Sequence, residues 1–111
     1  MEVEQLAMLV SLTRDYEREV EETTMVFNNL IAEINAAYFE NSIQAIYPGW
    51  NNGEIKWQDY LGTDHVERLS ARTRRGEEIK RVFDLAQKRE FLIREVRRLR
   101  RYLEDHGINH I

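Results

Sequence analysis

Residues 6–37 read LAMLVSLTRDYEREVEETTMVFNNLIAEINAA, and this stretch decides the fold. It contains no Gly or Pro, and its seam residues alternate at intervals of three and four. Two seven-residue registers result: Leu6, Thr13, Val20, Phe27 and Ile34, and Leu9, Tyr16, Thr23, Leu30 and Ala37. Because this spacing gathers side chains on one side of a helix, it predicts a long helix that packs against another helix. We expect this helix to run from about Val3 to about Gln44.

A second long helix is predicted from about Asp64 to about Asp105. At its start, Asp64 and Glu67 have the spacing of a capping box. At its end, Gly107 predicts a C-terminal cap, which leaves residues 106–111 as a tail. Gly76 weakens the helix, but the helical pattern resumes directly after it. We therefore expect a continuous or slightly bent helix there.

The connector, residues 45–63, holds most of the turn-forming residues. Pro48-Gly49 breaks the first helix, and Asn52-Gly53 is a strong tight-turn signal, so a short β-hairpin is predicted across Trp50–Trp57. Four large aromatic side chains crowd this segment: Tyr47, Trp50, Trp57 and Tyr60. Two interpretations stand. The aromatic residues either cap the end of the helices or form an exposed contact surface for a partner protein.

Charge is divided unevenly between the two halves of the chain. Residues 1–60 hold eleven acidic and three basic side chains, and residues 61–111 hold nine and thirteen, so the net charges are −8 and +4. We favour the interpretation that these fields pair the two helices in antiparallel orientation. The alternative is that the basic half contacts nucleic acid.

The second helix carries more apolar surface than one partner helix covers. Leu85, Leu92 and Leu99 form a seam, whereas Ile79, Phe83 and Ala86 lie on a rotated face, and Phe91 and Tyr102 lie on another side. A second contact surface is therefore implied, most simply from a neighbouring subunit. Two helices alone also bury little apolar surface, so we expect a homo-oligomer that completes a bundle.

Four arginines, Arg94, Arg97, Arg98 and Arg101, follow one another at intervals of three, one and three residues, and so share one face of the second helix. Arginine forms bidentate contacts with phosphate and carboxylate groups. Three interpretations of this face stand: contact with nucleic acid, contact with an acidic protein partner, or a solvated surface.

The sequence contains no motif that supports catalysis. There is no cysteine, no glycine-rich phosphate loop and no serine in a nucleophile motif. His106 and His110 have the spacing of a helical metal pair, but Gly107 and Asn109 interrupt the helix between them. We expect no catalytic residue, no cofactor and no metal site. No apolar run reaches membrane-spanning length, and acidic residues follow Met1, so we expect neither a membrane span nor a signal peptide.

The predicted fold is therefore all-α: an antiparallel helical hairpin in one domain, residues 1–111, with an aromatic connector. The predicted function is that of a non-enzymatic scaffold, adaptor, assembly factor or inhibitor, of which a small viral or phage assembly protein is one example. It would act inside the cell or within a larger particle, and bind protein partners. The candidate contact residues are Tyr47, Trp50, Trp57, Tyr60, Phe83, Phe91 and Tyr102. The alternative function is that of a nucleic-acid-contacting accessory protein that uses the arginine face.

Overall fold

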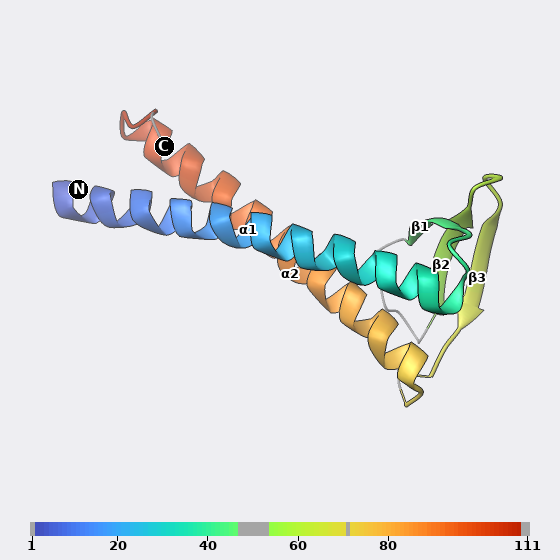
Figure 1. The fold of residues 1–111 in the computed structure, drawn as a ribbon. Helices are drawn as coiled ribbons and strands as arrows, with labels where there is room; N and C mark the ends of the chain where they lie inside the picture. Colours follow the sequence, from blue (N-terminus) through green and yellow to red (C-terminus); the bar gives the residue numbers. More distant parts are fainter. Residues whose placement is uncertain (1, 47–53, 71, 110–111) are drawn as a thin grey trace. The chain divides into compact units, whose positions relative to one another are not determined.

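The structure is a computed structural model, which describes residues 2–46, 54–70 and 72–109. In the sequence, two long helices flank three short strands. The order is α1 (Val3–Tyr38), β1 (Ile43–Ile46), β2 (Glu54–Asp59), β3 (Asp64–Arg68) and α2 (Arg74–Asp105) (Figure 1). The two predicted helices are present. The fold is not all-α, however, because β1, β2 and β3 form a three-stranded antiparallel sheet that extends beyond the predicted connector at both ends. No helix in the described part of the chain is both long enough and apolar enough to cross a membrane.

The chain forms two compact units, which are described separately. Unit 1 comprises Met1–Thr24 and Lys88–Ile111, and it contains the first part of α1 and the last part of α2. Unit 2 comprises Met25–Gln87, and it contains the remaining helical segments together with the sheet.

In unit 2, α1 ends at Tyr38, earlier than the predicted Gln44, because the backbone turns left-handed. Glu40 and Asn41 have φ angles of 52° and 61°, and the amide of Asn41 donates to the carbonyl of Asn35 at 3.0 Å. Asparagine tolerates the left-handed conformation better than most residues, and it satisfies a terminal carbonyl of the helix here. The apolar residues Ile43 and Ile46, which lie beyond this turn, become a strand.

The side chain of Asn35 joins the end of α1 to the first strand. Its amide nitrogen donates to the carbonyl of Ile43 at 2.8 Å, and its amide oxygen accepts from the backbone N–H of Ile43 at 3.1 Å. The asparagine amide thus imitates the backbone of a neighbouring strand. It satisfies both polar groups of a residue whose own side chain is buried.

The sheet has the order β1-β2-β3, and β2 lies at its centre. Ile46 pairs with Trp57, and Trp57 pairs with His65 on the other side. The predicted capping box at Asp64 was therefore wrong, because this segment is strand β3 and its side chains alternate between exposed and half-buried positions. The predicted turn at Asn52-Gly53 lies outside the described residues.

Helix α2 begins only at Arg74, where Thr73 is the N-cap. The Thr73 hydroxyl accepts from the amide of Gly76 at 3.0 Å and donates to the carbonyl of Ser70 at 2.9 Å. Gly76 therefore lies in the first turn of α2, and the expectation of a glycine inside a longer helix was wrong. A Cβ atom at this position would lie 1.8 Å from the carbonyl oxygen of Ser70, so the capping loop requires glycine.

Arg75 connects three elements of unit 2 at the start of α2. Its guanidinium lies 4.5 Å from the ring centroid of Phe39, which follows α1, and donates to the carboxylate of Glu67 in β3 at 2.8 Å. The planar guanidinium can stack on an aromatic ring and bind a carboxylate at the same time, which the ammonium group of lysine does poorly.

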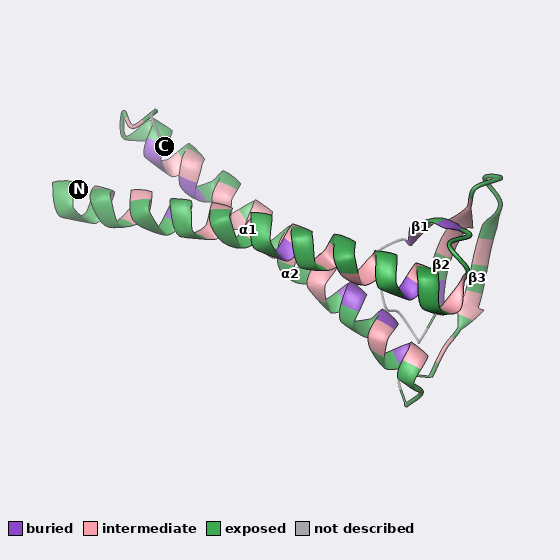
Figure 2. Ribbon diagram, in the orientation of Figure 1, coloured by how far each residue is buried: buried purple, intermediate pink, exposed green. Residues whose placement is uncertain are grey.

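The core of unit 2 contains helical and strand residues together. Ile79, Val82 and Phe83 of α2 are fully buried, and they share one apolar cluster with Ile34 of α1 and the strand residues Ile43, Ile46 and Ile55 (Figure 2). The rotated apolar face of the second helix was expected to need a neighbouring subunit. Within the described residues, the sheet of the same chain covers this face instead.

In unit 1, the two helical segments pair in antiparallel orientation. Arg89 donates to the hydroxyl of Thr24 at 2.6 Å, and Arg100 donates to the carboxylate of Glu17 at 2.7 Å. Residues later in α2 therefore pair with residues earlier in α1, as in an antiparallel pair. The predicted end of the second helix is confirmed. Gly107 has a φ angle of 82°, and the pattern of backbone hydrogen bonds around it is that of a Schellman motif.

Candidate protein-interaction site

The most exposed apolar side chains of unit 2 include those of the turn between β2 and β3. The amide of Asp59 donates to the carbonyl of Thr63 at 3.1 Å, and the amide of Gly62 donates to the carbonyl of Asp59 at 3.0 Å. Gly62 has a φ angle of 82°, a conformation that glycine adopts without a steric penalty. The backbone of the turn is therefore well defined by its own hydrogen bonds.

The carboxylate of Asp59 organises this turn from inside. One oxygen accepts the amides of Leu61 and Thr63, each at 3.0 Å, and the other lies 2.8 Å from Nε2 of His65. The hydrogen bond with His65, followed by the one from the Thr63 amide, lowers the pKa of Asp59 below its usual value. The turn is thus held by a charged carboxylate, and hydrogen bonds to a charged acceptor are stronger than neutral ones.

The side chains at the tip of this hairpin point away from the core. Leu61 is 92% exposed and Tyr60 is 67% exposed. Val66, on the polar outer face of β3, is 61% exposed. We call these three residues the hairpin tip. A single exposed leucine is unremarkable in proteins, but here Tyr60 and Leu61 are adjacent and exposed on a turn whose backbone is fixed by its own hydrogen bonds.

Trp57 contacts two neighbouring rings and the core of unit 2. Its ring stacks on His65 with centroids 5.3 Å apart and an interplanar angle of 12°, and its centroid lies 5.3 Å from that of Phe39. Trp57 is half-buried and packs against the core of unit 2. Of these aromatic residues of the connector, Trp57 therefore packs against the core of unit 2, whereas Tyr60 is exposed. Tyr47 and Trp50 lie outside the described residues.

A shallow hollow lies beside the tip on the strands β2 and β3. It is lined by apolar and charged side chains together: Lys56, Trp57, Asp64, His65 and Val66. A partner side chain that enters this hollow would meet aromatic and apolar side chains together with one positive and one negative group. Such a mixture is typical of protein contact sites, in which an apolar centre is surrounded by a polar rim.

The predicted arginine face in unit 1 is only partly available to a ligand. Arg98 donates to the carboxylate of Glu95 through two nitrogens, at 2.7 and 3.2 Å, and this contact lowers the pKa of Glu95. Arg94, Arg97 and Arg101 are exposed and make no ion pair among the described residues. Of the four predicted arginines, Arg94, Arg97 and Arg101 therefore remain available to a ligand, whereas Arg98 is paired with Glu95.

The remaining predicted contact residues fall in different places. Phe83 is fully buried in the core of unit 2, so its side chain packs there and is not presented on the surface. Phe91 is 52% exposed in unit 1, and Tyr102 is half-buried beside His106, with ring centroids 4.4 Å apart. The structure therefore brings Phe91 and Tyr102 into unit 1, and Trp57 and Tyr60 into unit 2.

The sequence patterns did not single out Leu61, the most exposed residue of the tip, or the side chains of Asp59 and His65 that organise the turn. A signal was present, because an aspartate two residues before Leu61-Gly62 is typical of an Asx turn. The apparent capping box at Asp64 concealed it, since a helix start and a hairpin turn use the same residue types.

Within the described residues, no group of three or more His, Asp or Glu side chains is placed to hold a metal ion. Comparisons with protein-family models, with curated proteins and with solved structures find no match to this chain.

Proposed function

We propose that this protein is a non-enzymatic interaction protein that binds a protein partner through the hairpin tip of unit 2. The observation that carries the proposal is the 92% exposure of Leu61 on a turn that is braced by Asp59. Burial of a leucine side chain contributes about 1.5–3 kcal/mol, so a partner gains from covering this tip.

Preorganisation supports the same function. Ordering a flexible loop during binding costs about 0.5–1.5 kcal/mol for each immobilised side chain, and a turn that is already fixed avoids part of the corresponding backbone cost. Tyr60 adds an aromatic ring with a polar hydroxyl, a combination that is enriched at interaction hot spots. The surface offered by three residues and one hollow is small, which suits an anchor that inserts into a pocket of the partner.

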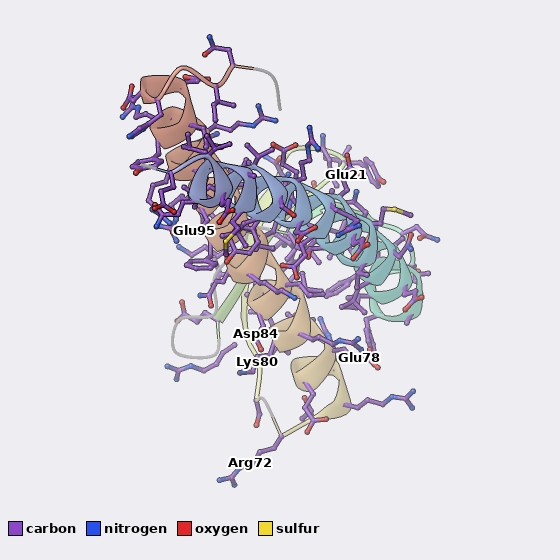
Figure 3. All side chains as sticks on the ribbon, turned by 90° about the vertical axis from the view of Figure 1, so that its left-hand side faces the viewer. Glu21, Arg72, Glu78, Lys80, Asp84 and Glu95 are labelled. Atoms are coloured by element: carbon purple, nitrogen blue, oxygen red, sulfur yellow. The ribbon has the colours of Figure 1, made fainter. Side chains whose placement is uncertain are left out.

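Site-specific photocrosslinking tests this proposal. A benzophenone amino acid replaces Leu61 in one variant, and Asp84, an exposed residue of α2 in the same unit, in a control variant (Figure 3). We expect adducts of discrete mass from position 61 that are absent from position 84, and that disappear when Tyr60→Ser is added. Equal crosslinking from both positions, in variants with equal thermal stability, would refute the proposal.

A second candidate function is contact with nucleic acid through Arg94, Arg97 and Arg101. The absence of ion-pair partners for these side chains among the described residues favours it. Phosphate contacts make binding depend on salt, so a gel shift at low and moderate salt tests this function. Binding that is lost when the three arginines become glutamates would support it, and no binding at low salt would exclude it.

A further inference from the structure

The helix pair of unit 1 has two unlike sides. The hydrogen bonds from Arg89 to Thr24 and from Arg100 to Glu17 both link the helices on one side, which we call the bridged side. Seven residues separate Glu17 from Thr24 and eleven separate Arg89 from Arg100. These spacings return to nearly the same face of an α-helix, so the two bridges share a side.

The opposite side is more apolar. Phe91, Glu95, Arg98 and Tyr102 are spaced by four, three and four residues, so they form one stripe along α2. Thr13 of α1 is buried, and Glu17 and Tyr16 follow it by four and three residues, so they lie on opposite sides of it. Because Glu17 belongs to the bridged side, Tyr16 lies on the same side as the stripe.

The contribution of α1 to this side continues toward the N-terminus. Leu12 lies one helical turn before Tyr16 and is 38% exposed, whereas Phe91 on α2 is 52% exposed. We call Leu12, Tyr16, Phe91 and Tyr102 the open side. Figure 3 agrees with this division, because Glu95 of the α2 stripe and Glu21 of α1 lie on different sides of the pair.

The apolar core within unit 1 is thin. Its buried apolar side chains, among the described residues, are Leu92, Leu99 and Leu103, and all three come from α2. The buried residues of α1 in this unit are Thr13 and Thr23. Thr13 satisfies its hydroxyl locally, by donating to the carbonyl of Leu9 at 2.7 Å. A pair of helices with so few buried apolar groups gains stability if further helices cover it.

Charge identifies the helices that complement the open side. Residues 1–24 hold seven acidic and two basic side chains, a net charge of −5, and residues 88–111 hold four acidic and seven basic side chains, a net charge of +3. A second copy that places its α2 beside α1 of the first copy juxtaposes opposite charges. A copy that places α1 beside α1 juxtaposes two strongly negative helices, which is unfavourable.

We propose that a second copy of this chain packs on the open side of unit 1, with each α1 beside the α2 of the other copy. The product is a four-helix bundle in which every adjacent pair of helices is antiparallel and oppositely charged. Such an arrangement follows from a two-fold axis parallel to the helices, and the same surface serves both copies. Leu12 of one copy then lies at nearly the same height as Tyr102 of the other, because the hydrogen bonds from Arg89 to Thr24 and from Arg100 to Glu17 define this register within one copy.

Disulfide trapping tests the proposal, and the absence of native cysteines makes the test clean. Leu12→Cys protein is mixed with Tyr102→Cys protein under mild oxidation. We expect a heterologous disulfide-linked dimer, with a yield at least about tenfold above that of Glu21→Cys mixed with Tyr102→Cys, because the bundle holds the first pair at a high effective concentration. Glu21 is the matched control, since it is exposed on α1 but lies away from the open side.

Light scattering of the unmodified chain gives an independent result. We expect a mass of twice 13.3 kDa, and Phe91→Glu should shift the mass toward that of one chain. A monomeric unmodified chain would overturn the proposal, as would trapping of Leu12→Cys with itself in preference to Tyr102→Cys. The outcome is separate from that of the photocrosslinking at Leu61, because the hairpin tip belongs to the other unit.

Discussion

Gly76→Ala should destabilise this protein, which reverses the usual effect of that substitution in a helix. At an ordinary helical position, alanine is more stable than glycine by about 1 kcal/mol. At Gly76, the added Cβ would lie 1.8 Å from the carbonyl oxygen of Ser70 and 2.9 Å from the hydroxyl of Thr73. Both neighbours belong to the loop that caps α2, so the cap must open or the backbone must move.

The expected magnitude combines three terms. Overpacking costs about 1–3 kcal/mol, and loss of a threonine N-cap costs about 1 kcal/mol. The gain in helix propensity returns about 1 kcal/mol. The net free energy of unfolding should therefore fall by about 1–3 kcal/mol, as the sum of these terms.

Urea denaturation followed by circular dichroism at the helical band measures this change. Lys88 provides the control, because it is exposed in the middle of α2. There, Lys88→Ala should be more stable than Lys88→Gly by about 1 kcal/mol. In a Thr73→Ala background, Gly76→Ala should cost less than it does alone, because the cap is already lost. A Gly76→Ala protein as stable as the unmodified chain would refute this account of the cap.

Three further predictions concern unit 2. Phe83→Ala should lower the free energy of unfolding by about 3–5 kcal/mol in urea denaturation, because the side chain is fully buried; a loss below 1 kcal/mol would contradict this packing. Asn35→Ala should cost about 1–3 kcal/mol and speed amide exchange at Ile43, since both bonds to that backbone are lost; unchanged exchange would argue against the bonds. Asp59 has a lowered pKa, so its stabilising effect is complete above the ordinary aspartate pKa and is lost as the pH falls through the lower pKa of the folded state. Asp59→Asn should therefore flatten the acid transition reported by Trp57 fluorescence, and an unaltered transition would show that other groups cause it.

Local sequence signals determined the parts of the fold that depend on neighbouring residues. The heptad registers predicted α1, and the leucine repeat predicted the greater part of α2, because helical hydrogen bonds join residues four positions apart. Gly107 predicted the end of α2, because a glycine cap acts only on the adjacent turn of the helix. The exposure of Tyr60 was one of two alternatives, and the sequence could not select between them.

The tertiary structure decided what depends on contacts between distant residues. Asp64 and Glu67 match a helix cap locally, but pairing with β2 makes that segment a strand, and a strand is stable only beside its neighbours. The rotated apolar face around Ile79 and Phe83 signalled a second contact, but not its source. The sheet of the same chain supplies that contact in unit 2, because left-handed turns after α1 bring Ile43 and Ile46 back to the core. Periodicity shows that a face must be covered, whereas only the folded chain shows which residues cover it.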